Sequence, residues 1–274
     1  MKSSLIQPYF VMSNSKYYKS NIKNIGISHF YSFNKDDLST CDMIAVPDGC
    51  IDILFNCNEN SPKAEVCGSV LQSFPVIIEK KTTYFGVRFY PGQGYPFKNI
   101  TLKEIINHQI PLNDILDANE LIEQITSCQD FSQQVQFFMN HYIKNLHKAI
   151  ALNEYMCLKT YMLNRIMETH GQIRIMNLAH ELGYSERYVN MKFMEFFGLS
   201  PKVFCKIIRF QHILNQLNNL PFDSEDTLLK IALDAGYYDQ SHMIKDFSQL
   251  SHNSPTKYLQ QLEKADYKNR LILL

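Results

Sequence analysis

An internal repeat in the last hundred residues constrains the fold more than any other feature of this sequence. Residues 178–185 align with residues 231–239: both begin with an apolar residue and Ala, continue to Gly and Tyr, and end on a residue that can cap a helix. A Ser-Pro pair follows each copy, and its prolines, Pro201 and Pro255, lie 54 positions apart. Chance is a poor explanation for this agreement. The sequence therefore predicts two copies of one supersecondary unit.

Each copy has the properties of a helix-turn-helix. Gly183 stands where the chain leaves the first helix, a position with positive φ that only Gly adopts at little cost. Ser185 supplies an oxygen that caps the second helix, as Asp239 does in the second copy. Apolar residues at i and i+4 then anchor that helix and leave its opposite face exposed. The predicted anchors are Val189, Phe193, Met243 and Phe247.

The exposed face of each second helix carries side chains that can read a major groove. Arg pairs with guanine, Asn and Gln pair with adenine, and apolar tips contact the thymine methyl group. These residue types are also common on any solvent-facing helix, so their place in the repeat is what favours a DNA contact. The predicted DNA-contacting residues are Arg187, Asn190, Met191, Lys192, Gln240, Ser241, Ile244 and Lys245.

Between the two units, residues 203–217 form one continuous helical pattern. A helix of this length spans about 22 Å and, with its flanking turns, can hold two recognition helices about 34 Å apart, one turn of B-DNA. Lys202, Lys206 and Arg209 add positive charge that we expect to face phosphates. Basic and acidic residues number 27 each over the whole chain, so a DNA-binding surface has to come from this local placement.

The segment of about residues 162–262 resembles the DNA-binding domain of the AraC/XylS family of bacterial transcriptional regulators. The resemblance is based on two segments: residues 239–242, Asp-Gln-Ser-His, and residues 193–201, which end in Gly-Leu-Ser-Pro. The resemblance implies two helix-turn-helix units joined by a long helix that bind double-stranded DNA, with Arg209 as the arginine common in that helix. His252 stands where the family usually has Gly. The family's base-reading positions fall on Arg187, Asn190, Met191, Gln240, Ser241, Ile244 and Lys245.

The first hundred residues indicate β structure. Short runs rich in β-branched and aromatic residues alternate with turn signals, which is typical of an antiparallel sandwich or small barrel. Beyond them, apolar residues recur at helical spacing, and neither Pro nor Gly occurs between Pro111 and Gly171. The connecting region is therefore predicted to be helical. The predicted strands are residues 25–33, 51–55, 74–78 and 84–90.

Three stretches of this half resemble an uncharacterised β-rich sensor domain found ahead of such DNA-binding domains. They are residues 46–56, 85–92 and 111–114. The resemblance implies a cupin-like barrel or sandwich followed by helices, with no settled ligand. We therefore predict an α+β chain with two domains. Residues 1–155 form a sensor or dimerisation domain with a helical connector, and residues 156–274 form an all-α double helix-turn-helix domain.

Arg88 lies inside an apolar strand run, where an unpaired charge would be costly. It either faces solvent or pairs with Asp48, Asp52 or an anionic ligand, and an internal pair or a solvent face is the simpler expectation. Aromatic residues beside it can line a pocket, although core packing is their default role in a strand. The candidate ligand-binding residues are Tyr84, Arg88, Tyr90, Asp48 and Asp52.

Composition excludes several classes of protein. A hydrophobic content of 45% with 20% charged residues excludes a disordered chain. Neither a run of about 18 apolar residues nor a signal peptide is present, which predicts a cytoplasmic protein with no membrane partner. The seven cysteines are odd in number and lack a C-x-x-C pair, which favours reduced thiols. Metal-ligand spacings and catalytic motifs are absent as well, so we predict no metal, no cofactor and no enzyme activity.

Three functional hypotheses remain. In the first, a sequence-specific transcriptional regulator binds a small molecule in its β domain, which changes its dimer state or its DNA affinity. In the second, the β domain binds no ligand and serves only for homodimer formation or partner binding. The third, an enzyme with a reactive cysteine that modifies DNA, has no catalytic motif behind it. The sequence separates the first two hypotheses poorly, and the operator and the sign of regulation stay open.

Overall fold

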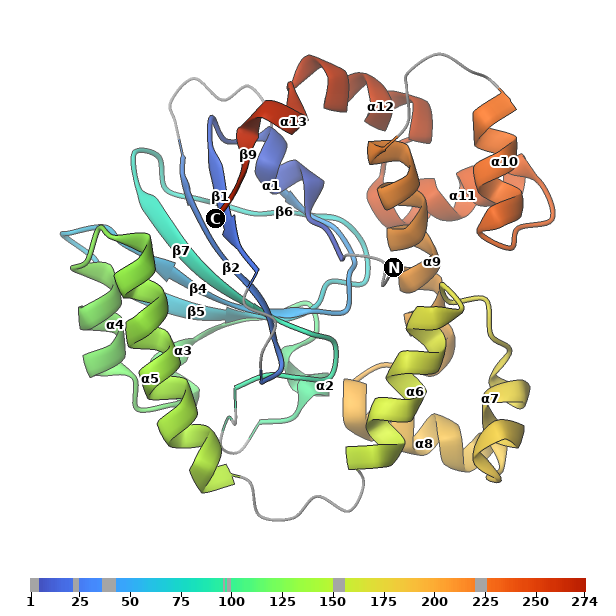
Figure 1. Ribbon diagram of the computed structural model, residues 1–274, viewed down its shortest axis with the longest axis horizontal. Coiled ribbons are helices and arrows are strands. Elements are labelled where there is room, and N and C mark those ends of the chain that lie inside the picture. The colour runs from blue at the N-terminus through green and yellow to red at the C-terminus, as the bar shows by residue number, and fades with distance from the viewer. Residues whose placement is uncertain are drawn as a thin grey trace.

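The computed structural model describes residues 5–21, 25–35, 43–95, 97, 100–149, 156–219 and 226–274. Figure 1 shows a β-sheet flanked by helices in the N-terminal half, next to a C-terminal half built from helices. The predicted α+β class, a β-rich first half followed by helices and then an all-α double helix-turn-helix arrangement, is confirmed.

A seven-stranded sheet forms the centre of the N-terminal half, in the strand order β8-β5-β4-β7-β2-β1-β9. Its neighbouring strands are antiparallel except β1 and β9, which are parallel. A two-stranded ribbon of β3 and β6 accompanies the sheet. The strands are β1 (Tyr17–Ser20), β2 (Ile27–Asn34), β3 (Ile44–Ala45), β4 (Ile51–Asn56), β5 (Lys63–Cys67), β6 (Phe74–Pro75), β7 (Thr83–Phe89), β8 (Gln109–Pro111) and β9 (Leu271–Leu273).

Three of the four predicted strands are adjacent in the sheet: residues 25–33, 51–55 and 84–90 correspond to β2, β4 and β7. The fourth prediction, residues 74–78, is wrong beyond Pro75, and the side chain of Ile77 is almost fully exposed. Strands β1, β5, β8 and β9 were not predicted. They are short and lie outside the central trio, so their hydrophobic pattern is weak.

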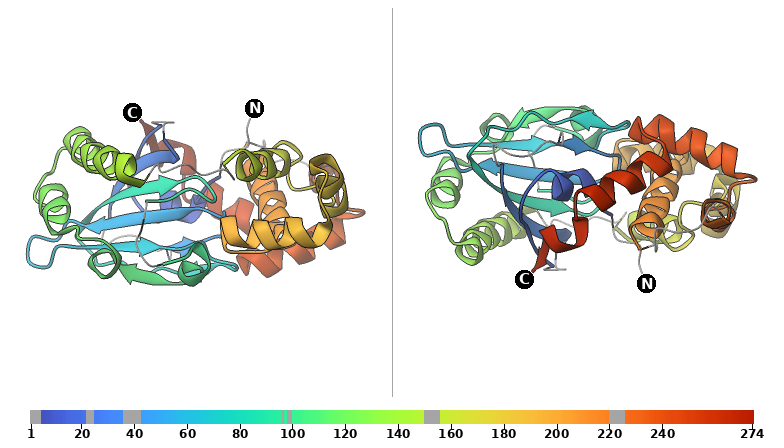
Figure 2. Two further views of the ribbon diagram at one scale, coloured as in Figure 1. Left: turned by 90° about the horizontal axis from the view of Figure 1, so that it is seen from below. Right: turned by 90° about the horizontal axis from the view of Figure 1, so that it is seen from above.

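Aromatic side chains fill the space between the sheet and two helices, α4 (Asn119–Thr126) and α5 (Phe131–Ala149), which cover one of its faces (Figure 2). Phe138 on α5 meets Phe30 and Phe55 of the sheet edge to face. Against the sheet also lies α1 (Pro8–Met12), which packs into a second cluster of aromatic residues. The centre of the sheet is therefore covered on both faces: every residue of β4 and all but the first residue of β7 are buried.

In the C-terminal half, two helix-turn-helix units, α7–α8 and α10–α11, pack on the long helix α9. The predicted helix at residues 203–217 is confirmed as α9. The C-terminal helices are α6 (Met156–Glu168), α7 (Ile175–Leu182), α8 (Glu186–Phe197), α9 (Pro201–Asn218), α10 (Asp226–Asp234), α11 (Gln240–Ser251), α12 (Pro255–Lys264) and α13 (Tyr267–Arg270), and two short helices, α2 (Leu102–Ile105) and α3 (Leu112–Ile115), belong to the N-terminal half.

The two halves are in direct contact. Gly49 has a positive φ, and a Cβ added to it would lie 2.6 Å from the ring of Phe204 on α9. Strand β9, which lies inside the predicted DNA-binding domain, pairs with β1 of the other half (Figure 1). The predicted boundary lies between residues 155 and 156, at the end of a segment, residues 150–155, that is outside the described part of the chain. The two-domain division therefore stays a prediction.

Candidate nucleic-acid interface and effector cavity

Both helix-turn-helix units have the predicted turn and caps. Gly183 has a φ of +70° at the end of α7, and Gly236 has a φ of +77° after α10. The Ser185 hydroxyl accepts a hydrogen bond from the N–H of Tyr188 at 3.3 Å, and the Asp239 carboxylate caps α11 in the same way. These local interactions fix where each second helix begins. The four predicted anchors are buried as expected: Val189, Phe193, Met243 and Phe247.

The open face of α8 carries three of the predicted DNA-contacting residues. Arg187 and Asn190 are exposed, and Met191 keeps 55% of its surface exposed. Lys192 is held closer to the helix, because its ammonium group lies 2.9 Å from the Glu195 carboxylate. The structure therefore brings Arg187, Asn190 and Met191 to one accessible surface and directs Lys192 towards its own helix.

The corresponding face of α11 is less open. Ser241 and Lys245 are exposed, whereas Gln240 and Ile244 are half-buried, and Ile244 packs against the apolar core of the second unit. His252 ends this helix with a φ of +53°, in the left-handed conformation that Gly adopts more easily. His252 therefore adopts the left-handed conformation at this helix end in spite of its side chain.

The three basic residues at α9 have different surroundings. Lys202 is exposed. Lys206 lies 2.9 Å from the Asp246 carboxylate of α11, and the Arg209 guanidinium lies over the ring of Tyr237, 5.3 Å from its centroid. Lys206 and Arg209 therefore take part in the packing of the second unit on α9, and Lys202 is the residue of the three with its charge turned to solvent.

Two exposed tyrosines lie beside the recognition helices and were not predicted as contacts. The ring of Tyr184 lies against that of Tyr188 near the start of α8, with the centroids 4.6 Å apart and the planes tilted by 34°. Tyr238 is 91% exposed immediately before the cap of α11. Helix-turn-helix proteins bring DNA close to the start of the recognition helix. The repeat contained the signal, since both tyrosines stand between the turn glycine and the capping residue.

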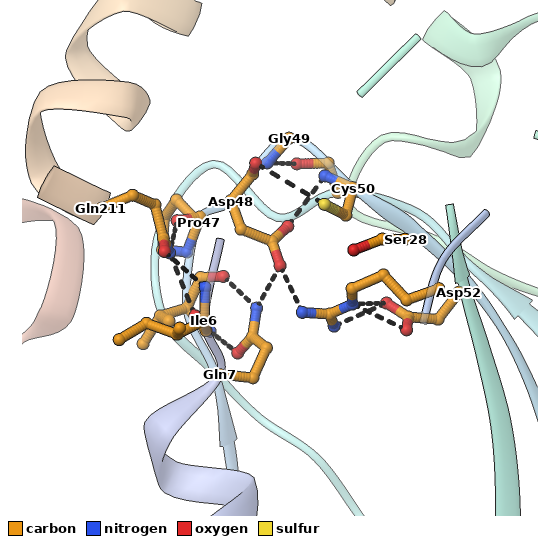
Figure 3. A network of polar contacts seen from close by, with 12 residues as sticks. Ile6, Gln7, Ser28, Pro47, Asp48, Gly49, Cys50, Asp52 and Gln211 are labelled. Carbon is orange, nitrogen blue, oxygen red and sulfur yellow. Dashed lines mark hydrogen bonds and ion pairs between the residues drawn. The ribbon is translucent and has the colours of Figure 1, made fainter. Parts of the chain in front are cut away.

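A cavity of about 70 Å³ lies in the N-terminal half, with Asp48, Asp52 and Arg88 in its wall. Arg88 is 5% exposed. It donates two hydrogen bonds to the Asp52 carboxylate, from Nε at 2.9 Å and from Nη2 at 2.7 Å. It donates a third from Nη1 to the Asp48 carboxylate at 2.8 Å. Of the alternatives for Arg88, the internal pair is the one observed, with both carboxylates at once. Asp48 and Asp52 bind different nitrogens of this group, Nη1 and Nη2, and Figure 3 shows the two carboxylates.

The wall of this cavity contains several perturbed ionisable groups. Burial raises the pKa of Asp52, and the neighbouring Arg88 opposes that rise. Burial would lower the pKa of the Arg88 guanidinium, but Asp52 and Asp48 outweigh this and raise it well above its ordinary value. Burial also raises the pKa of the Cys50 thiol and of the Tyr31 hydroxyl. The wall therefore combines one permanent cation and two carboxyl groups with a neutral thiol and a neutral phenol.

Two glutamines extend this polar cluster to the connecting helix, and sequence reasoning missed both. Gln7 donates from Nε2 to Asp48 at 2.8 Å. Gln211, a fully buried residue of α9, accepts from the N–H of Ile6 and donates to the oxygen of Pro47, each at 2.8 Å (Figure 3). A glutamine gives no sequence signal for such a role, because this residue type is usually exposed.

The remaining candidate residues lie elsewhere. Tyr84 is buried in another cluster, where its ring stacks on Phe33 at 5.3 Å, and neither Tyr84 nor Tyr90 lines the cavity. The six described cysteines are free thiols. Within the described ranges, no group of three or more His, Cys, Asp or Glu residues is arranged to hold a metal ion, and no helix is long and apolar enough to cross a membrane.

Two family models match the chain, one in each half. Residues 178–261 match a helix-turn-helix domain, and residues 26–111 match a domain of unknown function, DUF6597. No curated protein sequence matches significantly.

Several solved structures are similar to the chain at low sequence identity. A DNA-binding transcriptional dual regulator from Escherichia coli is 21% identical over 38% of this chain and 95% of its own, with a TM-score of 0.33. An apo variant of ToxT from Vibrio cholerae is 13% identical over 90% of this chain and 96% of its own, with a TM-score of 0.45. Wild-type ToxT bound to an unsaturated fatty acid is 13% identical, over 90% and 93%, with a TM-score of 0.39.

The helix-turn-helix match coincides with the two capped units on α9. The chain therefore carries an AraC-type helix-turn-helix domain in its C-terminal half.

Proposed function

We propose that the protein binds double-stranded DNA with α8 and α11 in successive major grooves and regulates transcription from that site. The observation that carries this proposal is the pair of units on one helix, each with a capped second helix, of which α8 is open on one face. The 18 residues of α9 give a rod of about 27 Å, which suits units one DNA turn apart. The proposed DNA contacts are Arg187, Asn190, Met191, Gln240, Ser241, Ile244 and Lys245, with Lys202 on a phosphate.

The cavity beside Arg88 is the proposed effector site of this regulator, which acts in the cytoplasm. Its wall combines two carboxyl groups with the aromatic residues Phe10, Tyr31 and Phe74. Such a wall suits a small molecule with a hydrogen-bond donor at one end and an apolar body at the other. A space of about 70 Å³ suits a small ligand.

A second candidate has the same DNA-binding function but no effector. The observation that favours it is that Arg88, Asp48 and Asp52 already satisfy one another inside the cavity wall. In this case the N-terminal half serves for homodimer formation or for binding a partner. Native mass spectrometry of the full chain, together with thermal unfolding in the presence of a small-molecule library, separates the two. A stoichiometric bound molecule supports the effector, whereas no bound or stabilising molecule supports the second candidate.

Selection of tight-binding duplexes from a random library tests the DNA-reading proposal. We expect the full chain to recover two short boxes about one helical turn apart. Arg187→Ala should relax the preference at one base position, at a cost of about 1–3 kcal/mol. Lys202→Ala should weaken binding to all sequences evenly and reduce the salt slope by about one. Unchanged preference and affinity in both variants would show that these residues do not contact DNA.

A further inference from the structure

The two helix-turn-helix units contact each other directly, in addition to their shared attachment to α9. Gln172, in the turn before α7, donates from Nε2 to the backbone oxygen of Asp234 at the end of α10, at 2.8 Å. Gly236 follows in the turn of the second unit, and a Cβ added to it would lie 2.8 Å from the Gln172 side-chain oxygen. The missing side chain at Gly236 therefore leaves room for Gln172 to cross from one unit to the other.

A polar cluster next to this contact joins three segments of the domain. The rings of His170, which precedes the first unit, and His212 on α9 stack with their centroids 4.0 Å apart and 7° between their planes. Nε2 of His212 lies 2.9 Å from the Asp234 carboxylate, which also accepts a hydrogen bond from Gln216 on α9. The cluster thus connects the turn before the first unit, the long helix and the first helix of the second unit.

The backbone of that turn is held close to α9. His170 and Gly171 both have positive φ, at +50° and +75°. A Cβ added to Gly171 would lie 2.2 Å from the backbone oxygen of Cys205, so the two chain segments are nearly in backbone contact. The turn that carries Gln172 is therefore fixed to α9 before it reaches the second unit.

We propose that His170, Gln172, His212 and Asp234 form a joint that sets the angle between α8 and α11, and so determines the spacing of DNA boxes that the protein accepts. This inference rests on the proposed reading of two successive grooves. Each base pair inserted between the boxes moves the second box by about 3.4 Å and turns it by roughly 34° around the DNA axis. Two units that cannot turn relative to each other bind DNA well at one spacing of the boxes. They bind poorly when the boxes are one base pair closer together or farther apart.

The alternative is that α9 fixes the angle without the joint. Each unit has apolar contacts with α9, such as Phe193 with Phe204 and Phe210 with Phe247. Such contacts hold a unit in place but have little directional preference, whereas a hydrogen bond depends strongly on its angle. The Asp234 side chain is 57% exposed and Gln172 is exposed as well, so the contacts of these two side chains add little to folding stability, and removing either one leaves the fold intact.

The experiment compares binding of the full chain to duplexes that differ only in the length of the spacer between the two selected boxes. We expect the wild-type protein to prefer its best spacing over one that is longer or shorter by one base pair by on the order of tenfold. In Gln172→Ala and Asp234→Ala, this preference should fall by roughly threefold or more, with unchanged affinity for a duplex that holds a single box. Gln172→Glu has the same size but no donor, and it should relax the preference in the same way.

Asn219→Ala is the matched control, because Asn219 also lies at α9 and its amide donates to the oxygen of Asn215 in the same helix. It should keep the wild-type preference. A spacing preference that stays unchanged in both Gln172→Ala and Asp234→Ala overturns the joint. A wild-type protein that binds single boxes but shows no preferred spacing overturns the proposed two-groove reading instead, and this result is visible before any variant is tested.

Discussion

At the scale of single residues, the burial of Arg88 between Asp48 and Asp52 is the clearest case of long-range electrostatic matching in this protein. The alternation of side chains along a strand did not show whether Arg88 faces solvent or the protein interior. The partners become visible only when Asp48, from the loop after β3, is placed next to β4 and β7. Ionised groups in such surroundings are tolerated because they are paired and hydrogen-bonded.

We expect Arg88→Met to lower the free energy of unfolding by about 3–5 kcal/mol, since it leaves two carboxyl groups buried without their partner. Urea unfolding of the purified variant measures this loss. Arg174→Met serves as the control, because Arg174 is exposed, and it should change the stability by less than about 0.5 kcal/mol. Similar small losses in both variants would contradict a stabilising role of the buried pair.

A second prediction at this scale concerns His29, which is 4% exposed on β2. Burial, with smaller contributions from Lys19 and Arg88, lowers the pKa of its imidazole well below the ordinary value. The unfolded chain binds a proton at His29 near its ordinary pKa of about 6.5, whereas the folded chain resists it. The stability that comes from neutral His29 is therefore present above pH 6.5 or so and decreases as the pH falls below it.

Urea unfolding at a series of pH values compares wild type with His29→Gln. The variant should lose less stability between about pH 6.5 and pH 5, because it lacks this proton-binding difference. Parallel pH profiles of the two proteins would show that His29 does not titrate differently on folding.

At the scale of elements, the two helix-turn-helix units were predictable from sequence because each signal acts within a few residues. A turn glycine, a capping side chain and apolar residues at i and i+4 fix a helix wherever the segment is placed. The short strands had no such local signal. The sheet neighbours of β5 and β8 are set by partners far along the chain, and a run of three to five residues does not reveal them.

Two glycines have the same backbone conformation but differ in how closely other atoms approach them. Substitutions at these glycines therefore distinguish the cost of backbone strain from the cost of a steric clash. Gly183 and Gly171 have φ values of +70° and +75°, but a Cβ at Gly183 would meet nothing within 4 Å, whereas one at Gly171 would meet Cys205. Gly183→Ala should therefore cost about 1–2 kcal/mol, from the left-handed backbone only. Gly171→Ala should cost roughly 1–3 kcal/mol more. Chemical denaturation of both variants measures the difference, and equal losses would contradict the close approach to α9.

At the scale of the whole molecule, the C-terminal strand β9 links the two halves. It pairs in parallel with β1 at the edge of the sheet, and the N–H of Leu274 donates to the oxygen of Lys19 at 2.9 Å. Immediately before β9, Arg270 donates to the oxygens of Met12 and Asn14. The helical half is thereby attached to the sheet at a point remote from α9.

We expect a variant that ends at Arg270 to show faster amide hydrogen exchange in β1, because that strand loses one of its two neighbours. Exchange in β4 and β7, at the centre of the sheet, should stay as in wild type. Mass-spectrometric exchange of the full chain and the shortened variant measures both regions. Unchanged protection of β1 would mean that β9 does not stabilise the sheet edge.

The amino-acid sequence by itself determined the double helix-turn-helix, its caps, the connecting helix and the open face of α8. These depend on residues close together in the chain, and a repeat displays them twice. Only the tertiary structure decided that Arg88 has two carboxylate partners, that Gln172 reaches Asp234 across 62 positions, and that β9 joins the N-terminal sheet. Each of these contacts joins segments that are distant in the sequence. No local pattern of residues specifies such a contact, so the packing of the whole chain decides which two segments meet.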